Sequence, residues 1–185
     1  MIKFIIPLLL IFNISHAVEF LGDFKQGSFI LGKTDPNSKV FIDDRKVRVS
    51  NDGYFAFGLD RDRKNNVLIK VKKDSFTKVI EKPVLKREYK IQRIDGLPKK
   101  QVTPPPEVFE RIKEDNKKIG KARSINSALD FFTKDFIYPI DKYIITGVYG
   151  SQRILNGKPR RPHYGIDFHA PEGTPVKAMM DGNVT

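Results

Sequence analysis

Short apolar runs that alternate with turn residues are the feature of residues 18–95 that most constrains the fold. The runs are rich in β-branched and aromatic residues, which favour strands. They cover residues 28–31, 39–42, 46–49, 54–57 and 67–71. Asp, Asn, Gly and Pro stand between them, as in Asp35-Pro36-Asn37 and Asn65-Asn66, and these residues favour turns. The pattern predicts a small all-β sandwich.

Asp52-Gly53 is the strongest turn signal within this region. Glycine adopts the positive φ that tight turns require, so the pair predicts a β-hairpin that joins Val49 to Phe55. The acidic residues of the region stand in turns and have no catalytic spacing. We therefore expect this domain to be a spacer or a binding module.

A proline-rich segment marks the start of a linker, residues 96–135. Gly96-Leu97-Pro98 and Thr103-Pro104-Pro105-Pro106 interrupt regular structure and favour a semi-rigid, extended spacer. Apolar residues at helical spacing then predict an amphipathic helix over residues 107–122, with its apolar stripe packed on a core. A second, shorter helix is predicted over residues 124–134. The fold class is thus mainly β with a short helical segment.

The first seventeen residues have the pattern of an export signal. Lys3 supplies the positive charge, an apolar run follows, and Ser15-His16-Ala17 is a small-x-small cleavage site. The alternative is a membrane anchor, but the run is shorter than the ~20 residues needed to span a bilayer. We expect cleavage after Ala17, no integral membrane segment afterwards, and a periplasmic or cell-wall location.

The chain is basic and contains no cysteine, with a formal net charge of +12. No disulfide can therefore support the fold. A basic surface favours anionic partners, and in an exported protein these are wall polymers or phospholipid headgroups rather than nucleic acid. A scattered basic surface that only aids solubility remains the alternative.

His163 and Asp167 form a His-x-x-x-Asp pair in a segment rich in glycine and proline. A regular strand would separate the two by roughly 13 Å, so they can share a metal only if the backbone bends. Gly165 permits such a bend, and imidazole and carboxylate both bind zinc. The alternative is a hydrogen-bonded histidine with a structural role.

Four motifs follow one another around this pair. They are Phe136-Ile137-Tyr138-Pro139, Thr146-Gly147-Val148-Tyr149-Gly150-Ser151-Gln152-Arg153, His163-Tyr164-Gly165-Ile166-Asp167 and Gly173-Thr174-Pro175-Val176-Lys177-Ala178. In order and spacing, residues 136–184 resemble the start of lysostaphin/LytM-type zinc endopeptidases. The resemblance implies an antiparallel β domain over residues 136–185, a zinc ion held by His163 and Asp167, and hydrolysis of peptide cross-links in peptidoglycan.

Members of that family have a further His-x-His downstream, which completes the zinc site and helps to polarise the water. The sequence ends at Thr185 without it, so we expect an incomplete metallopeptidase domain, inactive and with no catalytic residue of its own. Strands are expected at residues 176–178 and 183–185. His169 is expected to pack near the ligands rather than to bind zinc itself, although a His-x-x-x-Asp-x-His set is an alternative. Arg153 is a candidate for positioning substrate or the loops of the site.

Three functions follow from these observations. The first is a zinc-dependent peptidoglycan endopeptidase in the parent protein. The second is a non-catalytic module that binds the cell wall or activates other hydrolases. The third is a non-functional fragment in which only the β domain folds.

Overall fold

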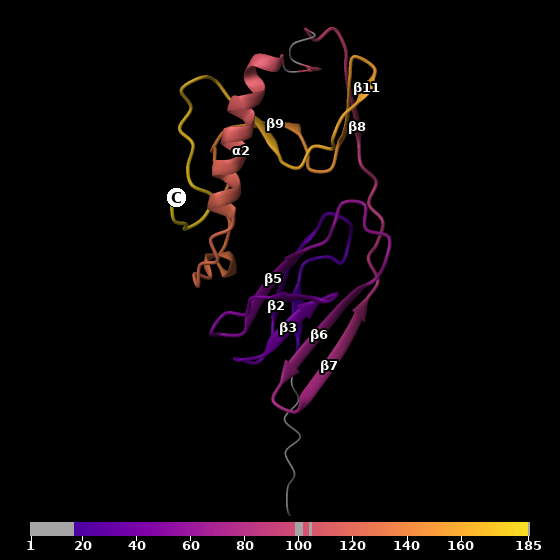
Figure 1. The fold of residues 1–185 in the computed structure, drawn as a ribbon, viewed down its shortest axis with the longest axis vertical. Helices are drawn as coiled ribbons and strands as arrows, with labels where there is room; N and C mark the ends of the chain where they lie inside the picture. Colours follow the sequence, from indigo (N-terminus) through magenta and orange to yellow (C-terminus); the bar gives the residue numbers. More distant parts are fainter. Residues whose placement is uncertain (1–16, 99–101, 104, 185) are drawn as a thin grey trace, which may run out of the picture.

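The computed structural model describes residues 17–98, 102–103 and 105–184. The expected export signal lies outside these residues, apart from Ala17. The protein is mainly β, with one α-helix, α2 (Phe109–Arg123), and two 3-10 turns, η1 (Pro106–Val108) and η2 (Phe131–Thr133), among the described residues. In Figure 1 the strands β2, β3, β5, β6 and β7 occupy the lower half, and α2, β8, β9 and β11 the upper half.

Two antiparallel sheets form the predicted sandwich. The first has the order β1-β2-β5, from β1 (Glu19–Leu21), β2 (Phe29–Lys33) and β5 (Tyr54–Gly58). The second has the order β4-β3-β6-β7, from β3 (Lys39–Ile42), β4 (Arg45–Val47), β6 (Val67–Lys73) and β7 (Phe76–Lys82). All five runs that the sequence pattern singled out lie on or across strands of these sheets.

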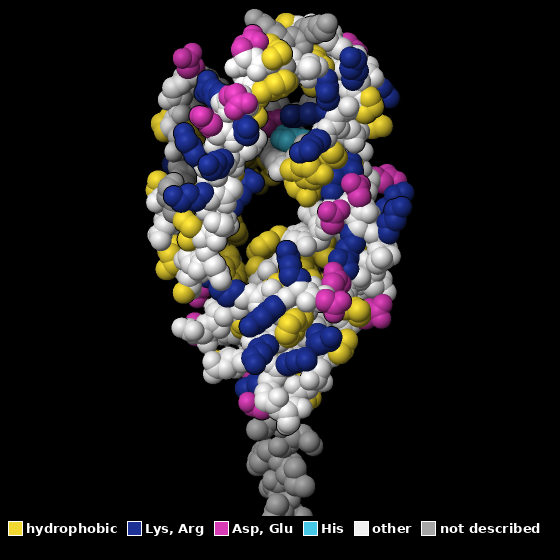
Figure 2. Space-filling view, viewed as in Figure 1, with side chains coloured by type: hydrophobic (Ala, Val, Ile, Leu, Met, Phe, Trp, Pro, Cys, Tyr) yellow, Lys and Arg dark blue, Asp and Glu magenta, His cyan; other side chains and the backbone are white. Residues whose placement is uncertain are grey.

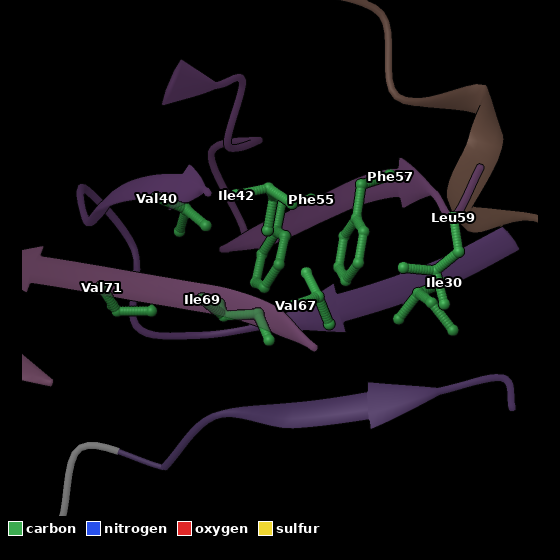
Figure 3. Close-up of a cluster of buried hydrophobic side chains, with 9 residues drawn as sticks. All are labelled: Ile30, Val40, Ile42, Phe55, Phe57, Leu59, Val67, Ile69 and Val71. Carbon is green, nitrogen blue, oxygen red and sulfur yellow. The ribbon is translucent and has the colours of Figure 1, made fainter. Parts of the chain in front are cut away.

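The core lies between the two sheets because alternate residues of each strand point inward. In β6, for example, Val67, Ile69 and Val71 are buried. Figure 3 shows the inward side chains of β2, β3, β5 and β6 pointing toward one another. The buried cluster is Ile30, Val40, Ile42, Phe55, Phe57, Leu59, Val67, Ile69 and Val71. Every one comes from residues 18–95, so this region has a core of its own.

The hairpin predicted at Asp52-Gly53 is wrong, although the turn itself exists. Gly53 has φ +86°, and a Cβ there would lie 1.9 Å from the carbonyl oxygen of Thr34. However, β4 before the turn pairs with β3, and β5 after it pairs with β2. The turn therefore passes the chain from one sheet to the other. A turn signal fixes only the local backbone and not the partner of each strand.

The helix predicted over residues 107–122 is confirmed as α2, but its apolar stripe is not in a core. Phe109, Ile112 and Ile119 are 49%, 41% and 46% exposed. The second helix, predicted over residues 124–134, is replaced by irregular chain and η2. Ser124 Oγ donates to the carbonyl oxygen of Lys121, and Leu129 N donates to Ser127 Oγ. Such local side-chain bonds compete with helix formation.

The C-terminal region contains two small β structures. β8 (Ile91–Ile94) pairs in parallel with β10 (Gln152–Leu155), which also pairs with β11 (Lys158–Pro159). β9 (Ile144–Gly147) pairs with the antiparallel strand β12 (Asp167–His169). Through β8, a strand from the expected 18–95 domain becomes part of the region that carries His163 and Asp167.

Strands expected at 176–178 and 183–185 do not form in the described part of this segment. Lys177 N donates to the carbonyl oxygen of Pro139, and Ile137 N donates to that of Met179. Pro139 has no N–H, so it cannot return a bond and extend this contact into a ladder.

Candidate metal centre

Two short backbone contacts place His163 beside the turn that follows β9. His163 N donates to the carbonyl oxygen of Ser151 at 2.8 Å, and Gly150 N donates to that of His163 at 2.7 Å. Asp167 begins β12 opposite Gly147, and the register of the pair shifts between Asp167 and Phe168. The chain bends at Gly165, between the two candidate ligands, as a shared metal would require.

The side chains of His163 and Asp167 point toward one another. His163 Nε2 lies 3.2 Å from Asp167 Oδ1, and the imidazole is 13% exposed whereas the carboxylate is 46% exposed. Protein therefore covers most of the imidazole of His163, whereas solvent reaches the carboxylate of Asp167.

Arg153, on β10, contacts both residues of the pair. One terminal nitrogen donates to Asp167 Oδ2 at 2.5 Å and lies 3.0 Å from His163 Nδ1. A guanidinium has no acceptor, so Nδ1 accepts here and Nε2 carries the ring proton; Nε2 lies 3.2 Å from Asp167 Oδ1. The three side chains form one cluster, in which Arg153 donates to both candidate ligands.

Gln92, on the neighbouring strand β8, accepts a hydrogen bond from Arg153. Arg153 Nε donates to Gln92 Oε1 at 3.3 Å, and the two residues are paired in the parallel register of β8 and β10. Sequence reasoning identified Arg153 but missed Gln92. The two are 61 positions apart, and no local pattern indicated that β8 would leave the sandwich.

Gly147 has no side chain, and this leaves room for the side chains of His163 and Asp167. A Cβ at this position would lie 2.5 Å from Asp167 Oδ2 and 3.1 Å from His163 Cε1. Backbone alone can approach the cluster so closely. In the sequence Gly147 was noted only as part of a motif, and its place beside the cluster depends on the pairing of β9 with β12.

His169 lies at the other end of β12, opposite Ile144, and its side chain is exposed. No hydrogen bond or ion pair joins it to His163 or Asp167 in the described part of the chain. Across residues 17–98, 102–103 and 105–184, no three His, Cys, Asp or Glu side chains are grouped so as to hold a metal ion.

The pair fits zinc in donor type and in spacing. Two ligand atoms on one tetrahedral zinc, each about 2.0–2.1 Å from the metal, lie roughly 3.3 Å apart. The Nε2 to Oδ1 distance of 3.2 Å is close to this value. His163 and Asp167 could therefore supply two of the three or four protein ligands that zinc requires.

Comparisons with known proteins add no assignment to this geometry. No family model matches the chain, and no curated protein is similar enough to count as a match. Within the described residues, no helix has the length and apolar character needed to cross a membrane.

Proposed function

We propose that His163 and Asp167 are zinc ligands of an endopeptidase domain that hydrolyses peptide cross-links of peptidoglycan. The observation that carries the proposal is the convergence of these two side chains at a distance suited to a shared zinc ion. The order of the four motifs around them supports the choice of reaction and substrate, through the resemblance described above.

A zinc ion held by these residues would supply Lewis-acid chemistry for hydrolysis of a peptide bond. His163 and Asp167 would hold the metal and transfer no proton. Binding through Nε2 requires the proton to leave that nitrogen and Nδ1 to become the donor. Arg153 cannot accept from Nδ1, so this contact must break, whereas its bond to Asp167 Oδ2 can persist and orient the carboxylate.

Zinc titration of the purified chain by calorimetry tests the metal site. His163→Ala and Asp167→Ala should each abolish the binding seen with the unaltered protein. His169→Ala is the matched control, because it removes an exposed imidazole from the same strand as Asp167. Equal losses in all three variants, or no zinc binding by the unaltered protein, would exclude the pair as ligands.

Release of soluble peptides from purified sacculi tests the reaction. A zinc-loaded parent protein that includes the downstream His-x-His should release them, and its His163→Ala variant should not. Zinc binding by that parent protein without any release would contradict the endopeptidase and favour the second candidate.

The second candidate is a non-catalytic module that binds the cell wall or activates other hydrolases. Arg153 favours it, because the guanidinium already satisfies His163 Nδ1 and Asp167 Oδ2 without a metal. Such a module should co-sediment with sacculi, and His163→Ala should leave the bound fraction unchanged. A bound fraction that depends on His163 and on zinc would exclude it.

A further inference from the structure

A hollow lies away from His163 and Asp167, where the sandwich meets β8 and β10. It has a volume of about 850 Å³. Residues 61–64, which follow β5, form one wall, and residues between β7 and β8 form the other, with Gln152 at the edge. This volume is within the range of small-molecule sites and is far larger than a single phosphate needs.

Gln26 ties the two walls together. Its Nε2 donates to the carbonyl oxygen of Arg63 at 2.7 Å, and its Oε1 accepts from Arg87 N at 3.0 Å. Tyr89 adds a third link, since its hydroxyl donates to the carbonyl oxygen of Arg61 at 3.3 Å. Burial raises the pKa of Tyr89, so the phenol remains a donor at neutral pH. The hollow is therefore built by specific contacts and needs no ligand to form it.

Its lining is strongly basic, with five Lys or Arg residues against Asp62 and Glu88. Two of the basic residues already have acidic partners. Arg63 contacts both carboxylate oxygens of Asp43 at 2.9 Å, and Arg61 pairs with Asp62. Lys64, Lys86 and Arg87 have no carboxylate partner among the residues that the structure describes.

Three cations around one hollow repel each other unless an anion lies between them. The Arg87 guanidinium lies 5.6 Å from the centroid of the Tyr89 ring, and this contact holds it at the wall. Figure 2 shows Lys and Arg side chains over both halves of the visible face, so a basic surface alone does not distinguish this place. What distinguishes this place is a preformed hollow lined by cations that have no carboxylate partner.

We propose that this hollow binds a soluble anion that carries several phosphate groups. A phosphate presents three acceptor oxygens and up to two charges to donors from different directions, whereas a carboxylate is planar and carries one charge. Lys64, Lys86 and Arg87 would each bind phosphate oxygens, and the volume accommodates a short chain of such groups.

Calorimetry with sodium tripolyphosphate in metal-free buffer tests the proposal. Lys64→Gln/Lys86→Gln should weaken binding at least about tenfold, because two charge-assisted contacts are lost. Lys117→Gln/Lys118→Gln removes the same charge from exposed positions of α2 and should leave the affinity within about twofold. Both lysine pairs are exposed, so the folded state should survive, and circular dichroism checks it.

Equal weakening in the two double variants would overturn the site, since only net charge would then matter. Citrate binding as tightly as tripolyphosphate would overturn the preference for phosphate. Because zinc is absent and neither His163 nor Asp167 is altered, the result is independent of the proposed endopeptidase.

Discussion

Arg61 donates a hydrogen bond from Nε to the carbonyl oxygen of Gly150 at 2.7 Å, which joins the sandwich to the turn beside the candidate metal centre. Tyr89 packs against the same turn. Gly150 has φ +86°, and a Cβ there would lie 2.0 Å from Tyr89 Cε1. The position of the turn therefore depends on a glycine at 150 and on a ring from the segment that leads into β8.

Gly150→Ala should detach this turn from Tyr89. Gly157→Ala is the control, because Gly157 also has a positive φ, +73°, but a Cβ there would meet nothing within 4 Å. Both variants incur the strain of a left-handed alanine, and only the first adds a steric clash. Urea unfolding should show Gly150→Ala to be about 1–3 kcal/mol less stable than Gly157→Ala. Equal stabilities would contradict the packing described here.

Gly147→Ala should disrupt the His163–Asp167 pair without affecting the sandwich. The added methyl group would lie 2.5 Å from Asp167 Oδ2, so the carboxylate must move. We expect zinc affinity to fall about tenfold or more, in the range found when groups that orient a ligand are lost. Gly182→Ala, where a Cβ meets nothing within 4 Å, should bind zinc like the unaltered protein. Unchanged affinity in Gly147→Ala would show that Asp167 is not a ligand in this geometry.

Arg153→Gln should strengthen zinc binding, by roughly tenfold if the contact costs about 1.4 kcal/mol. The substitution removes a cation next to the metal site and places near Nδ1 an amide oxygen that can accept a hydrogen bond from Nδ1–H. Nε2 is then free to bind the metal. Arg161→Gln, which removes an exposed charge nearby, is the control for net charge. Weaker binding in Arg153→Gln would indicate that Arg153 supports the metal-bound geometry instead.

Asp43→Asn should lower stability at neutral pH by less than about 1 kcal/mol, because the Asp43 side chain is 47% exposed. The hydrogen bond from Arg63 lowers the pKa of Asp43 below the ordinary value of 3.8. A depressed folded-state pKa stabilises the protein above that ordinary value, and the contribution disappears as the pH falls through the folded-state pKa.

The difference in unfolding free energy between Asp43→Asn and the unaltered protein should therefore be constant near pH 7 and shrink below about pH 4. Asparagine suits this position, because Asp43 has φ +49°. Asp44→Asn is the control, since Asp44 has no ion-pair partner among the described residues. A difference of equal size at pH 3 and pH 7 would contradict the role of the Arg63 contact.

Local pattern alone was enough to predict α2 and five of the seven sandwich strands, and it missed β1 and β7. It allowed His163 and Asp167 to lie close together but did not require it. Alternation of apolar residues identifies the buried face of a strand wherever that strand pairs, as in β6. The glycine-rich spacing around Gly165 allowed only a bent backbone if the two side chains were to meet. These properties depend on residues within a few positions of one another, so the sequence by itself determined them.

Tertiary structure decided which partners those elements found. It assigned β4 and β5 to different sheets, moved β8 from the sandwich to β10, and left residues 176–178 beside Pro139 without a ladder. It also placed Gln92 on Arg153 and enclosed the basic hollow between two loops. Each outcome depends on burial between distant segments and on the need to pair buried backbone groups. These two requirements leave no local signal in the sequence.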